Sequence, residues 1–589
     1  MCCRTLSGCR TIDSDQTALP KRCIRVTLPA NSKDVQLRLE ETNGGNGRYI
    51  CLSHRWVQPQ TEALSTTTQN YACRSSAIDF SSMPHNFQHV FLTAVRFGIQ
   101  YVWIDSLCVI QGSAGDWEEE SSKMGDYYQL AAFTVISTFP SNDSSYADYS
   151  PPKPFPLVRL PYRDSAGMQK GHFYVYPRAS ASQLGSVFEQ HLKTSQLLTR
   201  GWIFQEWLLS RRIVCFTQSG VYMQCQCRNE TVNNQLGDMA GSAALDYSAE
   251  AILSTKASLR LELRTAEDIY CGWEAVVEQY SSLTFSYPGK DRIKALLGVA
   301  NEFARALGRT PCHQGIGSVE DGFMAGLWKG DLHRGLLWEQ AAPGTHERLA
   351  KHPTWSWASV NTAIRWHSRH RVASLLLQTF DLPADGLPKV WWRCNAGSQL
   401  VLVAATSTDT LDSSRVEDGM MSRTIQQQNQ SHCLSSENLV SNLDVLHVRG
   451  CLQPVIVGEY LTGTSDTTIN WNSSREVGLS PSARRAVAVP ESRSAISGWA
   501  SLEHPEFQQQ SAFTPNPMIY ALLVSTPREW TERKAYLGFS EGCNVFNVLY
   551  LRRCEQIVDS FERLGMGKLF GFAAAKGFEI SVLRDIKLI

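Results

Sequence analysis

Three segments of the chain, residues 49–56, 101–111 and 200–210, gather the side chains that could do chemistry. Each segment contains or follows a strongly apolar run and carries hydroxyl, imidazole, carboxyl or thiol groups. Such groups act as nucleophiles and as general acids and bases. The candidates for a catalytic carboxyl are Asp105 and the run of glutamates that follows it, Glu118, Glu119 and Glu120.

Asp105 stands at the end of an apolar run, where a lone carboxylate is costly unless it is paired or close to water. One interpretation makes Asp105 a site acid or a ligand contact. The other makes it structural, as the cap of a neighbouring turn or as the partner of Arg55 or Arg200. The glutamates of 118–120 open a predicted helix, and the helix dipole alone explains acidic residues there.

Thiols and imidazoles allow two further hypotheses. Cys108 could be a nucleophile assisted by His54, although a small buried thiol is the more ordinary case. Cys225 and Cys227 would lie on one face of a strand, but no second pair of ligands accompanies them. We therefore predict no metal site. Walker A, G-x-G-x-x-G, H-E-x-x-H and G-x-S-x-G motifs do not occur in the chain.

The elements that must position these groups alternate between strand and helix. Short apolar runs predict strands at 49–53, 101–104 and 133–137, and helical periodicity predicts helices at 84–97 and 117–131. We expect Gly98 to end the first helix, and Asp116 with Glu119 to open the second. This alternation predicts a parallel sheet covered on both faces. Ligand sites in such sheets lie at the carboxyl ends of the strands.

The rest of the chain divides by pattern. An extension is predicted at 1–48, the α/β domain at 49–230, a mainly helical region at 231–352 and a β-rich region at 353–589. The α/β domain ends in a predicted hairpin of strands 213–216 and 221–225. Stretches rich in Ser, Thr, Asn and Gln, at 405–440 and 461–483, are predicted to be surface insertions.

Composition limits the class of protein. The 589 residues carry 56 Lys+Arg and 56 Asp+Glu, so broad electrostatic binding to nucleic acid or to anionic lipid is not expected. The 17 cysteines are odd in number and scattered, which favours reduced thiols and a cytoplasmic location. The most apolar long stretch, 90–110, is interrupted by charges, so no transmembrane segment is predicted.

The three chemistry-bearing segments closely resemble the fungal heterokaryon incompatibility domain family in residue type, order and spacing. Further blocks at 291–298, 325–328, 353–359 and 561–565 resemble the downstream parts of these proteins, so the resemblance covers about residues 20–570. One departure is Val57, which stands where the family usually has glycine. The positions that carry the family motif are Ser53, His54, Trp56, Trp103, Asp105, Cys108, Gln111, Trp117, Arg200, Gly201, Trp202, Gln205 and Glu206.

This resemblance implies a signalling protein of fungal nonself recognition and programmed cell death, acting by self-association or through protein partners without a cofactor. The family is also distantly similar to Toll/interleukin-1 receptor domains, some of which cleave NAD. That similarity implies an alternative, an NAD-cleaving enzyme, whose glutamate would follow a middle strand. Here Glu118–Glu120 follow the second predicted strand, and no glutamate follows the third until Glu189. A third alternative is an accessory or regulatory protein of a biosynthetic pathway.

Overall fold

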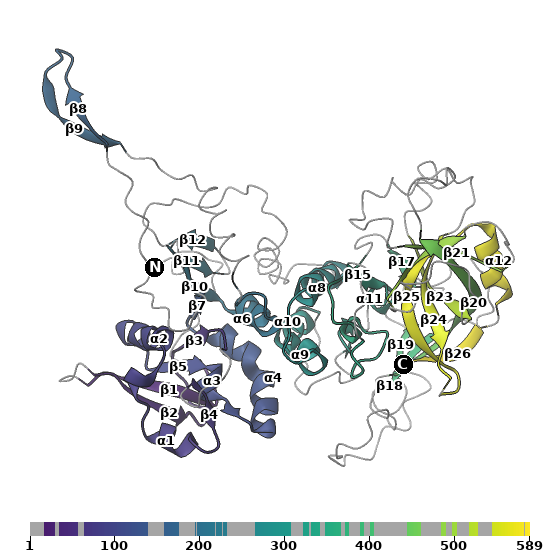
Figure 1. Ribbon diagram of the computed structural model, residues 1–589, viewed down its shortest axis with the longest axis horizontal. Helices are drawn as coiled ribbons and strands as arrows, with labels where there is room; N and C mark the ends of the chain where they lie inside the picture. The colour runs from purple at the N-terminus through teal and green to yellow at the C-terminus, as the bar shows by residue number, and fades with distance from the viewer. Residues whose placement is uncertain are drawn as a thin grey trace. The chain divides into compact units, whose positions relative to one another are not determined.

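The computed structural model describes the chain in segments that fall into two compact units (Figure 1). The first unit comprises residues up to 263 together with 283–286 and 294–306, and the second comprises the remainder. The described residues are 17–29, 34–56, 64–138, 158–175, 195, 197–217, 220–225, 228–231, 266–307, 322–328, 331–341, 348–366, 372–375, 389–393, 401–405, 445–460, 484–490, 497–503, 518–527, 545–555, 557–581 and 583–589.

A mixed sheet of eight described strands forms the centre of the first unit, in the order β12-β11-β10-β7-β3-β5-β1-β2. Its middle is parallel, as the sequence predicts, and antiparallel strands extend it on both sides. The predicted hairpin is present as β10 and β11, and β10 adds a fourth parallel strand. The bounds are β1 (Arg22–Thr27), β2 (Gln36–Glu41), β3 (Tyr49–Ser53), β5 (Tyr101–Ile104), β7 (Thr134–Ser137), β10 (Arg212–Thr217), β11 (Gly220–Cys225) and β12 (Arg228–Thr231).

Helices cover both faces of the parallel strands, and every residue of β3 is therefore buried. Tyr49 and Cys51 point toward α4 (Ala114–Leu130), where both contact the carbonyl oxygen of Tyr127. Side chains alternate along a strand, so the intervening residues of β3 face the other side. There α2 (His85–Arg96) packs against β1, β3 and β5. Smaller elements of this unit are β4 (Thr66–Thr67), α1 (Tyr71–Ser76), α3 (Asp105–Cys108), β6 (Ile110–Gln111), β8 (Val158–Arg163), β9 (Gln169–Val175) and α6 (Gly201–Leu209).

Gly98 follows α2 with a positive φ of 64°, which confirms the predicted helix end. The predicted start of α4 was wrong by a few residues. The helix begins at Ala114, and the Ser113 hydroxyl caps it by accepting a hydrogen bond from the Asp116 amide. The Asp116 carboxylate is taken instead by Arg22 of β1, at 2.5 Å, and by the Ile110 amide. The Asp116 carboxylate, which the local pattern predicts to cap α4, therefore forms a tertiary ion pair with Arg22 instead.

Segments far along the chain complete the first unit. The Thr284 amide donates to the Thr199 carbonyl, and the Gly201 amide donates to the Thr284 carbonyl, so 283–286 lies beside the start of α6. A Cβ on Gly201 would stand 1.9 Å from the Phe285 ring. Helix α10 (Leu297–Ala306) packs on α4 and α6, and Gly298 permits close contact with the backbone of α4.

The second unit contains a closed barrel, because β20 (Val445–Tyr460) pairs with both ends of a series of strands. The six barrel strands run in the order β20-β21-β22-β25-β24-β23 and back to β20. Helix α12 (Phe572–Ile580) packs Ala574 and Phe578 into the same apolar core. The other barrel bounds are β21 (Arg485–Ala488), β22 (Gly498–Leu502), β23 (Ile519–Pro527), β24 (Val545–Arg553) and β25 (Ser560–Phe570).

Shorter described elements surround the barrel in the sequence, and the second unit bears out the prediction of a β-rich region. They are α8 (Ala266–Ser281), α9 (Pro288–Lys294), β13 (Phe323–Met324), β14 (Leu327–Trp328), α11 (Leu332–Gly335), β15 (Trp338–Gln340), β16 (Ile364–Trp366), β17 (Val372–Leu375), β18 (Lys389–Arg393), β19 (Val401–Ala405) and β26 (Leu583–Leu588). The predicted insertions, from residue 406 of the first and throughout the second, lie outside the described residues. The region boundaries given above stay a prediction.

Gly201→Ala should destabilise the first unit by roughly 1–3 kcal/mol, because its methyl group would overlap the Phe285 ring. Gly115→Ala is the matched control, since nothing lies within 4 Å of its Cβ position in α4. Alanine there should stabilise by about 0.5–1 kcal/mol. Thermal unfolding of the full chain measures both. Equal shifts for the two variants would contradict the packing of 283–286 against α6.

Candidate functional site

The structure brings Ser53, His54, Asp105 and Glu206 together at the carboxyl ends of β3 and β5, and the sheet topology predicts this for the first three. Ser53 ends β3 and His54 follows it, while Asp105 follows β5. Glu206 comes from α6, which is tied to β7 by a 2.6 Å hydrogen bond between the Ser210 and Thr134 hydroxyls. Neighbouring parallel strands thus supply three of the groups, and a helix from much later in the chain supplies the fourth.

Asp105 is held by its neighbours from two sides. One carboxylate oxygen accepts from the Trp56 indole Nε1 at 2.7 Å, and the other accepts from the Ser106 amide at 2.7 Å. The His54 Nδ1 atom lies 3.5 Å from the second oxygen. These contacts therefore fix the Asp105 carboxylate in the first turn of α3, with Trp56 and His54 as side-chain neighbours.

His54 is buried between the strand ends and α2. Its ring meets the Phe87 ring edge to face at 4.8 Å, and Nε2 lies 3.5 Å from the Ser106 hydroxyl. Burial lowers the pKa of His54, the Asp105 carboxylate opposes this effect, and the charge of Arg200 adds to it. The imidazole is therefore neutral at neutral pH and can accept or donate a proton through either nitrogen.

Glu206 is the most perturbed carboxyl of this cluster. Burial raises its pKa to about 8, and the charge of Asp105 adds to the rise. The hydroxyls of Ser53 and Tyr128 and the charge of Arg200 pull the pKa down without offsetting these effects. Among the described residues, the Oε2 atom of Glu206 and the Ser53 and Tyr128 hydroxyls are buried without a well-formed hydrogen bond. Unmet polar atoms at this depth call for an explanation beyond packing.

This arrangement places a carboxyl that keeps its proton at neutral pH near a second carboxylate and a neutral imidazole. Pairs of titratable groups whose environments push their pKa values apart are the usual equipment for acid–base chemistry. Asp105 is the most accessible of the three, with 14% of its side chain exposed against 4% for His54. We conclude that the cluster can hold and exchange a proton at the edge of the sheet.

The surroundings of Cys108 do not favour the hypothesis of a nucleophilic thiol. Its side chain is buried, and burial raises the pKa of the thiol to about 12, so the thiolate is scarce at neutral pH. The Cys108 thiol lies 3.5 Å from the Ile104 amide. The backbone carbonyl oxygen of Cys108 accepts a hydrogen bond from the Arg22 guanidinium. These contacts agree with the alternative interpretation of a small structural thiol.

The three glutamates of α4 lie in other surroundings. Glu118 is exposed and pairs with Lys294 at 2.5 Å, and Glu119 is an exposed partner of Lys21 and Lys123. Glu120 is buried, lies 3.3 Å from the Tyr127 hydroxyl, and has a pKa raised by burial. The described contacts join none of them to Asp105.

The remaining motif positions build the frame around the cluster. Trp103 packs on Tyr127 and Tyr128 of α4, and the Trp117 and Trp202 rings meet at 5.5 Å where α4 contacts α6. Gln205 accepts from the Gly298 amide at 2.8 Å and so fixes α6 to α10. Gln111 donates to the Val109 carbonyl within β6. Val57 lies outside the described residues.

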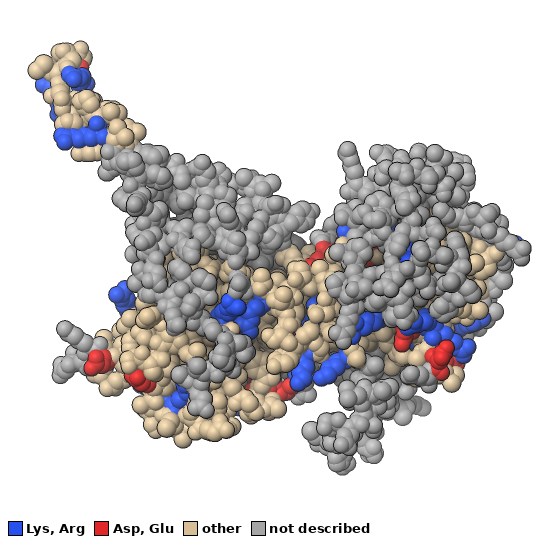
Figure 2. All heavy atoms as spheres, in the orientation of Figure 1, with Lys and Arg blue, Asp and Glu red and all other residues tan. Residues whose placement is uncertain are grey.

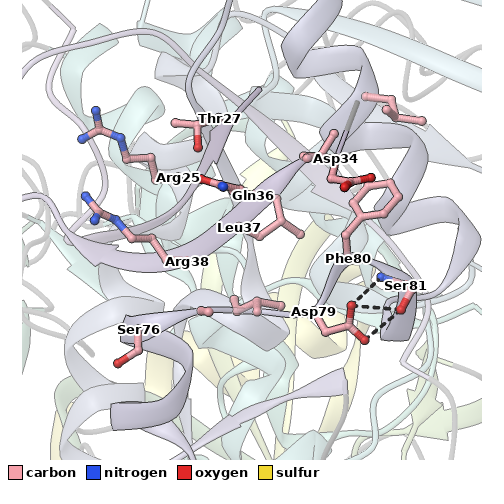
Figure 3. A pocket seen from close by; sticks show the side chains of 14 residues that line it. Arg25, Thr27, Asp34, Gln36, Leu37, Arg38, Ser76, Asp79, Phe80 and Ser81 are labelled. Carbon is pink, nitrogen blue, oxygen red and sulfur yellow. Dashed lines mark hydrogen bonds between the residues drawn. The ribbon is translucent and has the colours of Figure 1, made fainter. Parts of the chain in front are cut away.

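A cavity of about 790 Å³ lies apart from this cluster, against β1, β2 and the segment 76–81 (Figure 3). Its charged groups already have partners. Arg25 and Arg38 both bond to Glu40, and the Asp79 carboxylate accepts from Ser81. None of the motif positions lines it.

The described residues contain neither a membrane-spanning helix nor a cluster of metal ligands. No described helix is long and apolar enough to cross a membrane. No group of three or more described His, Cys, Asp or Glu side chains could hold a metal ion. Cys227 of the suggested cysteine pair lies outside the described residues.

Comparison with known proteins yields one family. The model described as heterokaryon incompatibility protein matches residues 49–206, from the first residue of β3 to Glu206 in α6. The chain carries a heterokaryon incompatibility domain. No match was found among curated proteins or among solved structures. The heterokaryon incompatibility domain thus includes Ser53, His54, Asp105 and Glu206, which we call the rim cluster. Helix α10, which packs on α6, lies beyond the end of the domain.

Sequence reasoning did not single out Tyr128 and Ser106 as members of the cluster. The burial of Tyr128 beside Glu206 depends on the packing of α4 against α6, which local sequence does not reveal. Ser106 follows Asp105 directly, so the end of β5 was the signal that could have found it. Glu206 was named from the family motif alone, because its charge state arises from tertiary burial.

Glu206→Gln should change how stability depends on pH. The pKa of Glu206 is raised from 4.5 to about 8 on folding, so its contribution to stability is present below about pH 4.5 and is lost as the pH rises through 8. Glutamine cannot ionise, so the variant should lack this loss, which we place on the order of 2–4 kcal/mol. Chemical denaturation from about pH 5 to about pH 9 measures it.

Glu119→Gln is the control for this experiment. Hydrogen bonds from Lys123 and Lys21 lower the pKa of Glu119 to about 2, so its titration lies below the measured range. Its stability should follow the wild-type pH profile. If the Glu206→Gln profile also runs parallel to wild type, Glu206 does not hold a proton in the folded chain.

Proposed function

We propose that this chain is a signalling protein of fungal nonself recognition and programmed cell death, and that its first unit is the effector. The observation that carries the proposal is the cluster of buried Glu206 and His54 with the half-buried Asp105 within the heterokaryon incompatibility domain. Burying two carboxyl groups at one site costs stability. A fold that needed only packing would be served better by apolar side chains there.

The proposed means of engagement is protein association, either with partners or with further copies of the chain. The equal numbers of acidic and basic residues support this, because they leave no broad field for nucleic acid. Association would act on the domain edge that carries the cluster of Asp105, Glu206 and His54. The effector would then respond through proton exchange or ligand contact at Asp105 and Glu206.

Expression of the full chain in a fungal host, with cell viability as the measurement, tests the proposal. The wild type should reduce viability, and Glu206→Gln should abolish the effect. At neutral pH Glu206 is mostly protonated in the folded chain, so glutamine is close to an isosteric replacement, and the melting temperature should not fall below the wild-type value because the variant lacks the pH-dependent loss of stability described above. Glu119→Gln removes an exposed carboxyl from the same domain and should keep full toxicity.

A wild type without effect on viability would reject the effector function. Toxicity that survives in Glu206→Gln would instead show that the cluster is not the effector site. Asp105→Asn is a weaker test, because Asp105 accepts two hydrogen bonds and its loss should cost about 1–3 kcal/mol of stability.

A second candidate function is cleavage of NAD, which the rim cluster favours over the glutamates of α4. In such a reaction water attacks the ribose carbon attached to nicotinamide, and the carbon–nitrogen bond breaks with its electrons passing to the ring. The proton of the attacking water needs a base, and Asp105 is the most accessible carboxylate of the cluster. Its charge would also stabilise the positive charge that develops on the ribose.

Incubation of the pure chain with NAD tests this candidate, with nicotinamide release as the measurement. Asp105→Asn should slow release by about 10²–10⁴-fold, while joint replacement of Glu118, Glu119 and Glu120 by Gln should leave it unchanged. The reverse result would place the catalytic carboxyl on α4. A wild type that releases no nicotinamide would reject the enzyme function.

A further inference from the structure

The hairpin of β8 and β9 has one apolar face and one basic, polar face. Directly paired residues of antiparallel strands share a face, and side chains alternate along each strand. Val158 pairs with Val175 and Leu160 with Phe173, and Tyr162 pairs with Gly171. One face of the hairpin is therefore made of Val158, Leu160, Tyr162, Phe173 and Val175.

All five apolar side chains of this face are exposed, from 37% for Leu160 to 57% for Tyr162. Met168, beside the turn, is 65% exposed. Scattered exposed apolar residues are ordinary, but a contiguous face of them marks an interaction surface. A two-stranded hairpin is also marginally stable alone in water. This hairpin therefore gains stability from whatever covers its apolar face.

The opposite face and the turn are basic. Arg159 contacts His172 across the strands at 2.9 Å, and Arg163 donates to the Gly167 carbonyl. Lys170 lies at the register shift and approaches Asp164 at 3.5 Å. Three permanent cations thus face a single carboxylate, and Figure 2 shows the blue side chains along the hairpin. The neutral net charge of the whole chain conceals this local excess.

Area and charge together select the occupant. Two strands of this length present a face of roughly 20 Å by 10 Å, which is small beside the ≈ 800 Å² that each partner of a stable protein interface buries. An anionic bilayer surface requires no matching partner face, accepts aromatic and aliphatic side chains below its headgroups, and attracts Lys and Arg.

We propose that the β8–β9 hairpin binds the surface of an anionic lipid bilayer, with its apolar face and its turn in the headgroup region and the cations beside the turn, Arg163 and Lys170, against lipid phosphates. The hairpin lies on the surface and does not cross the membrane. This inference goes beyond the proposed function and uses none of the rim cluster, so a chain that fails to kill can still bind lipid.

Sedimentation of the pure full chain with vesicles tests the proposal. The chain should bind vesicles of phosphatidylcholine with phosphatidylserine, bind phosphatidylcholine alone much less, and lose binding as salt rises. Leu160→Ser with Phe173→Ser removes the centre of the apolar face. Joint replacement of Arg159, Arg163 and Lys170 by Gln removes the cations. Each should weaken binding by about tenfold or more.

Matched controls carry the same chemistry elsewhere. Tyr287→Ser with Val558→Ser removes two exposed apolar side chains, and joint replacement of Arg96, Lys290 and Lys576 by Gln removes three exposed cations. Both controls, and Glu206→Gln, should bind as the wild type does. Because the side chains changed in the hairpin variants and in the two matched controls are exposed, the melting temperature of each of these should stay close to the wild-type value.

Absence of binding to either vesicle would overturn the proposal, as would binding that the hairpin variants leave unchanged. Light scattering supplies the remaining outcome. A dimer that Leu160→Ser with Phe173→Ser dissociates, without vesicle binding by the wild type, would show that this face joins copies of the chain instead.

Discussion

The cost of burying carboxyl groups at the ends of parallel strands constrains the first unit more than any other interaction. Asp105 meets this cost with hydrogen bonds from the Trp56 indole and the Ser106 amide. Glu206 has no comparable donors among the described residues and meets it by keeping its proton, because burial and the charge of Asp105 raise its pKa to about 8. The two acidic side chains thus meet this cost in different ways. The raised pKa of Glu206 lets this edge of the sheet hold and exchange a proton. The shift depends on the position of α6, because that position sets the burial of Glu206.

The position of α6 depends in turn on chain that lies beyond the heterokaryon incompatibility domain. The domain match ends at Glu206, yet Gln205 is fixed by the Gly298 amide and the start of α6 is fixed by 283–286. Close approaches at Gly201 and Gly298 leave no room for side chains larger than hydrogen. The segments that supply these contacts alternate along the sequence with segments of the second unit. The first compact unit is therefore longer than the heterokaryon incompatibility domain, and segments of the second unit interrupt it along the sequence.

The second unit handles buried charge differently. Arg563 is fully buried, stacks on the Trp338 ring at 3.6 Å and pairs with Glu503 at 2.6 Å, so its charge is matched. The stacking of Arg563 on Trp338 links β25 to β15, and its pair with Glu503 links β25 to the residue that follows β22. The rim cluster of the first unit leaves its carboxyl without such a partner. A matched pair serves packing, whereas an unmatched titratable group retains the capacity to exchange a proton.

Much of this protein was determined by local sequence. Three apolar runs can be buried on both faces, namely Tyr49–Ser53, Tyr101–Ile104 and Thr134–Ser137. Their parallel pairing and the helices that cover them therefore followed from the sequence pattern. The convergence of Ser53, His54 and Asp105 followed from the same topology. Tertiary structure decided the rest. Asp116 pairs with Arg22 instead of capping α4, the β10 strand joins the parallel core, and Gly298 supports Gln205. The charge state of Glu206 was beyond sequence because a pKa reports desolvation and neighbouring charges, and segments far apart in the chain supply both.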